Sequence, residues 1–325
     1  MSALSSALAV KAPLWRFRAG SLPGVLAFLA LTAIAFTGNE DLVVLATQTL
    51  IFILFAVSLN LLVGYAGLIS VGHAAVYATG GYVAGHLAKT GNAGFAAALA
   101  AGIVASGILA GIMAAISVRR EKTYFIMLTL AVAQLVSVVI SKWKAVTGGD
   151  DGLIGFAPPP ALQGSTAYYV FTALLVVLSL VGIHRLVSSP YGRALRAIRD
   201  NPQRASFTGI NVARLQISVF VISGLFAGLA GSLMAFHQRG MFIQSSSFLT
   251  STDALVVCVL GGPRYFAGPI VGAILFRVLT GVLPDVTAYW ASVLGLVILL
   301  IGRFLPGGLL SILPKAEGTH EGTHE

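Results

Sequence analysis

Residues 42–63 read LVVLATQTLIFILFAVSLNLLV and contain no charged side chain. An α-helix needs roughly 17–25 apolar residues to cross the hydrocarbon core of a bilayer. Further apolar runs lie at 22–37, 65–88, 93–118, 123–141, 167–183, 215–237, 252–262, 266–283 and 286–302. The sequence therefore predicts an all-α, polytopic integral membrane protein with about ten transmembrane or partly spanning helices.

The composition supports a chain covered by lipid. Of the 325 residues, 57% are hydrophobic and only 10% are charged, with a mean hydropathy of +0.91. Soluble domains carry about 25% charged residues, so this chain cannot solvate a globular surface. The long unbroken runs exclude a membrane β-barrel, whose strands are short and alternating. Cys258, the one cysteine, lies in an apolar run and is expected to be a buried hydrophobe.

The net charge of +9 indicates membrane orientation and not nucleic-acid binding, because Lys and Arg gather at the ends of the apolar runs. Basic residues cluster at 119–122 and 185–214, and acidic ones at 39–41 and 150–151. If all runs cross, the positive-inside rule places both basic clusters and both termini in the cytoplasm. The expected organisation is a basic N-terminal segment over 1–20, a transmembrane domain over 21–305 with a cytoplasmic loop at 185–214, and a polar, disordered tail over 306–325.

Two charges interrupt the later apolar runs. Asp253 lies near the start of the run at 252–262, and Arg277 lies within the run at 266–283. Charges inside a membrane are costly and usually have a partner or face water. Both residues are equally far along the chain from Tyr265, so a hairpin there would bring them to similar depth. We predict a structural Asp253–Arg277 ion pair; the alternative is that Arg277 extends to the outer headgroups.

The basic segment contains an organised stretch, SPYGRALRAIRDNPQRASFTGINVAR (189–214). Ser189 is a suitable N-cap and Pro190 suits the first helical turn. Apolar residues follow at helical spacing along one stripe, formed by Tyr191, Ala194, Leu195 and Ile198. The other side carries Arg193, Arg196 and Arg199. Asn201-Pro202 then interrupts the helix, and a second short turn carries Phe207 and stops at Gly209.

This amphipathic helix has two interpretations. It binds anionic lipid on the cytoplasmic face, at about 1 kcal/mol per basic residue, or it docks apolar anchors into a groove of a cytoplasmic partner. A lipid-bound helix needs neither the Asn201-Pro202 break nor the second turn. The sequence therefore favours docking.

The segment SLNLLVGYAGLISVGHAAVYATGGYVAGH (58–86) combines many glycines with polar side chains. Small residues allow helices to pack closely in lipid. Alternatively, a helix broken at 64–73 exposes backbone groups to a polar solute. The residues expected to line or border such a path are Asn60, Gly64, Gly67, Ser70, His73, Tyr77 and, from 123–141, Gln134. For His73 and Gln134 an interhelical hydrogen bond is the alternative. Gly224, Gly228 and Gly231 form an expected close-packing face, within this chain or against a partner.

The sequence contains no G-x-x-x-x-G-K-[ST] loop, zinc or EF-hand spacing, or nucleophile elbow. An enzyme and a metal site are therefore not predicted, and if ATP drives this protein, ATP and Mg²⁺ bind another chain. A stand-alone secondary transporter or channel is the other class. Such a protein commonly needs carboxylates at the midplane, and the runs hold no central Asp or Glu.

Four stretches resemble one known family. They are LNLLVGYAGLISVGHAAVYATGGY (59–82), YFIMLTLAVAQLV (124–136) with TGGDDGLIG (147–155), the stretch 189–231 and LGGPRYFAGPIVGA (260–273). These stretches are similar to the branched-chain amino-acid ABC permeases, specifically the LivM-like subunit, with 189–231 resembling the family's coupling-loop region. The resemblance covers most of 45–305 in the right order. Pro263-Arg264-Tyr265-Phe266 and Arg277 depart from its pattern, which puts the local path of 260–280 in question.

The resemblance implies a transport subunit in the bacterial inner membrane that works with a second permease, two cytoplasmic ATP-binding subunits and an extracytoplasmic binding protein. It also implies alternating access driven by ATP. The coupling helix would present Arg193, Arg196, Arg199 and Asp200 as its polar face and Tyr191, Leu195, Ile198 and Phe207 as anchors, with Gly209 as its stop. Branched-chain or other amino acids are the expected substrates, and related permeases for urea or short amides are the alternative.

Overall fold

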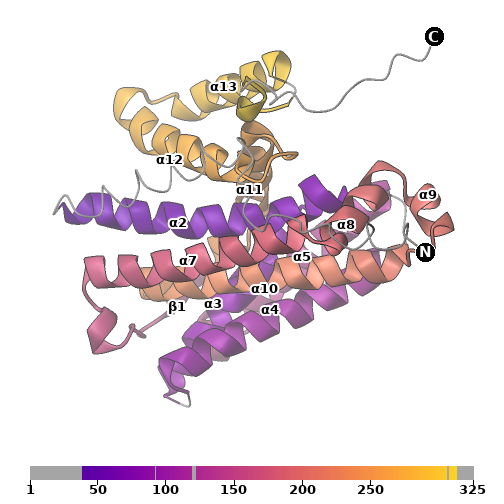
Figure 1. The fold of residues 1–325 in the computed structure, drawn as a ribbon. Helices are drawn as coiled ribbons and strands as arrows, with labels where there is room; N and C mark the ends of the chain where they lie inside the picture. Colours follow the sequence, from indigo (N-terminus) through magenta and orange to yellow (C-terminus); the bar gives the residue numbers. More distant parts are fainter. Residues whose placement is uncertain (1–38, 92, 119–121, 306, 313–325) are drawn as a thin grey trace, which may run out of the picture.

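The computed structural model describes residues 39–312 except 92, 119–121 and 306 (Figure 1). The predicted basic segment 1–20, the first apolar run at 22–37 and Arg119 and Arg120 lie outside the described residues. The tail predicted from 306 is described only to 312, where Leu309–Ile312 form a short 3₁₀ helix.

The chain is built almost entirely of helices. The α-helices are α2 (Glu40–Asn60), α3 (His73–Thr90), α4 (Phe95–Ser117), α5 (Lys122–Lys142), α6 (Lys144–Thr147), α7 (Ser165–Ser188), α8 (Pro190–Asp200), α9 (Pro202–Phe207), α10 (Val212–Gln238), α11 (Phe248–Gly261), α12 (Gly268–Val286) and α13 (Trp290–Phe304). A π-helix, η2 (Leu61–Ala66), continues α2. Two short strands, β1 (Leu153–Ile154) and β2 (Gly240–Met241), pair antiparallel.

Six helices of the described chain are long and apolar enough to cross a membrane. They are Glu40–Ala66, Phe95–Ser117, Thr123–Lys142, Ser165–Ser188, Val212–Gln238 and Trp290–Ser311, and two shorter apolar helices cover Phe248–Gly261 and Gly268–Gly281. The prediction of a multi-pass helical membrane protein is confirmed. The count of about ten stays a prediction, because the run at 65–88 forms only the shorter, more polar α3 and the first run is outside the described residues.

Small residues let α10 pack tightly against α3 and α4. A side chain on Gly231 would overlap the carbonyl oxygen of Tyr77 in α3, and one on Gly228 would overlap Ser106 in α4. The Ser106 hydroxyl donates to the Val76 carbonyl at 2.9 Å. Such close backbone approach is how helices associate in lipid, and it confirms the packing face predicted on α10.

Helix α2 lies between this group of helices and the later helices α11 and α12 (Figure 1). It contacts α7 and α10 on one side and α11 and α12 on the other. Its side chains are buried along most of its length, from Val43 to Asn60. Helix α2 therefore belongs to both groups of helices and joins them.

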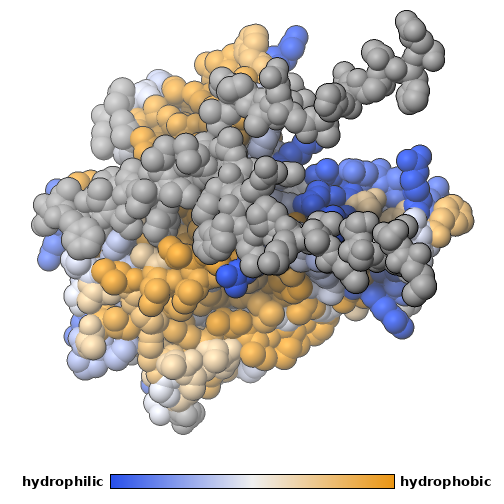
Figure 2. Space-filling model, in the orientation of Figure 1, coloured by the Kyte–Doolittle hydropathy of each residue, from blue (hydrophilic) through white to orange (hydrophobic). Residues whose placement is uncertain are grey.

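The two ends of the bundle differ. Segments α8 and α9 precede α10, whereas β2 follows it and pairs with β1. Because α10 has 27 residues, these ends are separated by about 40 Å. Figure 2 shows hydrophobic residues over the middle of the molecule and hydrophilic ones around α8 and α9. Exposed side chains on α4 include Val104, Ile108, Ile112 and Ile116, which suits a lipid-facing stripe.

Candidate functional site

The chain leaves the helical conformation between α2 and α3. After the π-helix Leu61–Ala66, Gly67 adopts a φ of +71° and residues 67–72 form no helix before α3 begins at His73. π-turns are rare and often accompany functional sites. The interruption expected at 64–73 is therefore present in the backbone.

Two glycines let distant segments reach this break. A side chain on Gly64 would overlap the carbonyl oxygen of Pro263, in the loop between α11 and α12. At Gly67, an added Cβ would lie 2.8 Å from Cγ of Arg199 in α8. The break thus contacts both the hairpin of α11 and α12 and the amphipathic helix.

Arg199 ties α8 to the π-helix. Its Nη1 donates a hydrogen bond to the carbonyl oxygen of Gly64. Its Nε and Nη2 donate to Asp200 Oδ1, both at 3.2 Å, in the one salt bridge found among the described residues. Hydrogen bonds from a charged donor are stronger than neutral ones. The contact therefore links the surface helix to the broken one.

The apolar stripe of α8 faces the chain's own bundle. Leu195 is 0% exposed and Ile198 is 1% exposed. The Tyr191 hydroxyl lies 2.7 Å from the Ser218 hydroxyl of α10, and Arg196 Nη1 donates to the Val187 carbonyl at 3.1 Å. The expectation that Leu195 and Ile198 anchor a partner is therefore not met, because the chain's own bundle buries them.

Other residues of this segment face outward. Arg193 and Asp200 are exposed, and Phe207 is 90% exposed on the short helix α9. Gly209, which follows with a φ of +83°, is exposed as well. The Ser189 hydroxyl donates to the Leu186 carbonyl at 2.6 Å and does not cap α8. An outward face of charges with one projecting aromatic ring is thus available to a partner.

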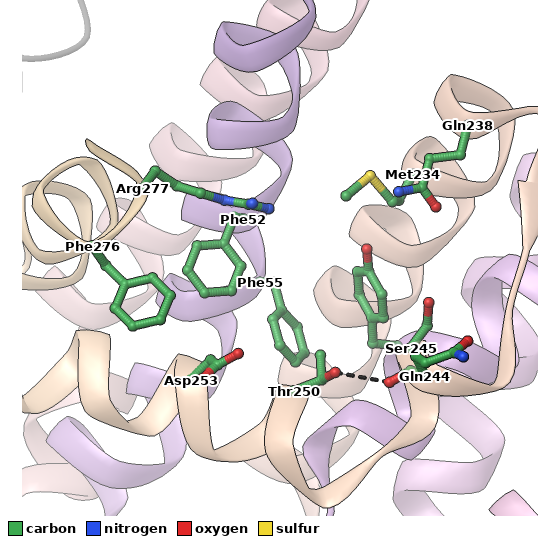
Figure 3. A pocket seen from close by; sticks show the side chains of 11 residues that line it. Phe52, Phe55, Met234, Gln238, Gln244, Ser245, Thr250, Asp253, Phe276 and Arg277 are labelled. Carbon is green, nitrogen blue, oxygen red and sulfur yellow. Dashed lines mark hydrogen bonds between the residues drawn. The ribbon is translucent and has the colours of Figure 1, made fainter. Parts of the chain in front are cut away.

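A cavity of about 230 Å³ lies near the end that carries β2 (Figure 3). Its apolar wall consists of Phe52, Phe55, Tyr77, Met234 and Phe276. Its polar wall consists of Gln238, Gln244, Ser245, Thr250, Asp253 and Arg277. The walls come from α2, α3, α10, α11, α12 and the segment before α11. Helices on both sides of α2 therefore contribute to the cavity.

Asp253 and Arg277 share this cavity without touching. No guanidinium nitrogen of Arg277 lies within 4.0 Å of an Asp253 oxygen, although both side chains are described. The Arg277 Cζ lies over the Phe52 ring instead, 5.0 Å from its centroid. In Figure 3 the Phe52 ring lies between the two charged groups. The hairpin brings both residues to one cavity, but the predicted direct ion pair does not form.

The predicted path residues separate into groups. Tyr77 lines the cavity, and His73 lies behind its wall, stacked on Phe55 with centroids 5.4 Å apart. His73 Nε2 is 3.0 Å from the Ser58 hydroxyl. Asn60 and Ser70 are buried beside the break, where no described side chain or backbone group bonds Asn60 Oδ1 or Ser70 Oγ.

Gln134 does not join the other path residues. Its side chain is exposed on α5, which presents several apolar side chains outward in the same way. Gln134 does not line the cavity described above, and its role in a path stays a prediction.

Sequence reasoning missed most of the cavity lining. Gln238 ends α10, Gln244 and Ser245 lie in the segment that follows, and Thr250 lies in the first turn of α11. The signal was present in QSSSFLTSTD (244–253), a polar stretch between two apolar runs. The Thr250 hydroxyl donates to the Gln244 carbonyl at 2.9 Å, which folds this stretch over the cavity (Figure 3).

Known proteins with similar sequences are permeases. The family described as "Branched-chain amino acid transport system / permease component" matches residues 42–302. The LivM high-affinity branched-chain amino acid permease of Escherichia coli K12 is 32% identical over 85% of this chain and 71% of its own length. The LivM protein of Salmonella typhimurium is 31% identical over 84% and 70%.

Sugar permeases match over a smaller part. The xylose transport permease XylH of E. coli K12 is 31% identical over 41% of this chain and 35% of its own length. No solved structure gives a significant match. Since the family match extends from α2 to α13, this chain is a transport permease subunit and belongs to the family of permease components of branched-chain amino acid transport systems.

Proposed function

We propose that this chain is one permease of an ATP-driven importer for branched-chain or other amino acids in the bacterial inner membrane. It works with a homologous second permease, two cytoplasmic ATP-binding subunits that hold ATP and Mg²⁺, and an extracytoplasmic binding protein. We orient the chain with α8 and α9 facing the cytoplasm, which places the cavity in the outer half of the membrane.

The observation that carries this proposal is the Arg199 contact. The segment formed by α8 and α9 exposes Arg193 and Phe207 to a partner. The same helix holds the carbonyl of Gly64 at the start of the broken stretch. Movement of an ATPase against the outward face is therefore transmitted to the helix that walls the cavity, as alternating access requires.

A stand-alone, ion-coupled transporter has one observation in its favour. Asp253 faces the cavity, and intramembrane carboxylates often bind coupling ions. Its dependence on an ion gradient distinguishes it from an ATP-driven importer.

The first experiment asks whether an ATPase binds the outward face. We would purify the chain from its native membrane in mild detergent and identify the associated proteins by mass spectrometry, for the wild type and for Arg193→Glu/Phe207→Glu. Both positions are exposed, so the fold should survive. Tyr289→Glu is the control, because Tyr289 is an exposed aromatic residue (77%) outside this segment.

We expect an ATPase with the wild type and the control and its loss in the double variant. An ATPase that remains bound to the double variant would refute this docking face. A wild type that carries no ATPase would refute the importer proposal, and uptake driven by an ion gradient would then be measured in vesicles.

A further inference from the structure

We infer that the cavity binds a solute carrying both a negative and a positive group, with Arg277 receiving the anionic group and Asp253 the cationic one. The inference rests on the proposed import function and assigns the recognition of its substrate to two residues. It replaces the structural ion pair that the sequence suggested.

The first step is that Arg277 is held without an anion. Its guanidinium lies against the Phe52 ring, and among the described residues Nε is buried with no hydrogen-bond partner. A cation on an aromatic face is stabilised by less than the cost of burying a guanidinium. The remaining edge of the guanidinium faces the cavity, where an anionic group would complete it.

The second step is that Asp253 also lacks a counter-ion among the described residues. Its carboxylate also lines the cavity, and no described donor forms a hydrogen bond with it. Opposite charges that share a cavity ordinarily close into a salt bridge unless something holds them apart. Here the ring of Phe52 on α2 holds the guanidinium of Arg277 on α12, away from the carboxylate of Asp253 on α11. A ligand with two charges bridges the gap that the protein leaves.

The third step concerns the class of solute. An uncharged sugar or amide would displace water from both charges and return no counter-charge, which is unfavourable for buried ions. A zwitterion supplies both, and the apolar wall of Phe55, Tyr77 and Phe276 accepts a non-polar side chain. Zwitterionic α-amino acids with apolar side chains therefore fit the cavity better than neutral solutes do.

Binding to the purified transporter complex, without its soluble binding protein, tests the inference. The probes are L-leucine, 4-methylpentanoate, which lacks the ammonium group, and isoamylamine, which lacks the carboxylate. Affinities come from displacement of radiolabelled L-leucine. We expect each single-charge analogue to bind at least about ten-fold more weakly than L-leucine, because each loses a charged hydrogen bond.

Variants then assign each charge. Arg277→Gln should weaken the binding of L-leucine at least about ten-fold and leave the binding of isoamylamine unchanged. Asp253→Asn should weaken the binding of L-leucine to a similar extent and leave the binding of 4-methylpentanoate unchanged. Arg277→Lys should retain most of the affinity. Arg264→Gln is the control, because Arg264 is an exposed arginine in the same hairpin and lies outside the cavity.

The inference is overturned if the wild-type complex does not bind L-leucine at millimolar concentration, if the analogues bind as well as L-leucine, or if both variants bind like the wild type. ATP-driven uptake by the reconstituted wild type is measured separately. Its absence would refute the importer proposal, whereas normal uptake by both variants would refute only the assignment of this site.

Discussion

Gly67 is the residue at which the broken helix touches α8. Its φ of +71° is a conformation that costs other residues roughly 1–2 kcal/mol. A Cβ there would also lie 2.8 Å from Arg199 Cγ, so a side chain would push away the arginine that holds Gly64. Backbone conformation and packing therefore require glycine at the same position.

Gly67→Ala should consequently destabilise the protein more than Gly91→Ala. Gly91 has a similar φ of +66° but open space around its Cα, so its substitution costs only the backbone term. We expect Gly67→Ala to lose an additional ~1–3 kcal/mol of unfolding free energy, about the cost of overpacking, and its thermal unfolding midpoint in detergent to fall further than that of Gly91→Ala. Equal losses in the two variants would show that Arg199 yields freely.

At the scale of elements, α10 is held by the close approach of its small residues to α3 and α4. A side chain on Gly231 would meet the Tyr77 backbone, which cannot rotate away. On α7, by contrast, Gly182 has no neighbouring atom that an added Cβ would meet. The same substitution should therefore have opposite signs on two apolar helices.

Gly231→Ala should lower stability by about 1–3 kcal/mol, as overpacking does, and Gly182→Ala should raise it by up to about 1 kcal/mol, as helix propensity favours alanine. Both are measured from thermal unfolding of the purified variants. A Gly231→Ala protein as stable as the wild type would mean that α3 and α10 can separate without cost.

The elements also show what sequence patterns can decide. Long apolar runs predicted α2, α4, α5, α7 and α10 because lipid offers their backbones no partner outside the helix. The end of α2 could not be predicted in detail, because the π-turn depends on Pro263 and Arg199, which come from distant parts of the chain. The stripe of α8 predicted an apolar contact but not its identity, and the chain's own bundle provides it.

The site was harder to predict for the same reason. Asp253 and Arg277 stood out as charges in apolar runs, and the hairpin of α11 and α12 brings both to one cavity. Whether they pair depends on the position of the Phe52 ring, which belongs to α2. Gln238 ends α10 and Gln244 lies in the short connection before α11, where no periodic pattern predicts the path of the chain.

At the scale of the whole molecule, the bundle has a hydrophobic middle and two dissimilar ends. The end with α8 and α9 is basic, and the other carries the acidic turn Asp150-Asp151 next to β1. The proposed orientation places the basic end in the cytoplasm, as the positive-inside rule requires.

Cysteine labelling tests this orientation directly. Cys258 is 0% exposed, so the natural chain should not react with a membrane-impermeant maleimide. We expect Asp151→Cys to be labelled in spheroplasts and Gln203→Cys only after the membrane is opened, since both positions are exposed at opposite ends. The reverse pattern would invert the topology, and labelling of the natural chain would contradict the burial of Cys258.

The π-helix has a mechanical consequence. A π-turn holds one residue more than an α-turn, and successive residues of an α-helix are rotated by about 100° about the helix axis. Arg199 donates a hydrogen bond to Gly64 within this turn, and Phe52 and Phe55 lie on α2, which the π-helix continues. Gaining or losing that one residue would rotate both rings about the helix axis, so a change of this turn at the surface helix would alter the cavity wall.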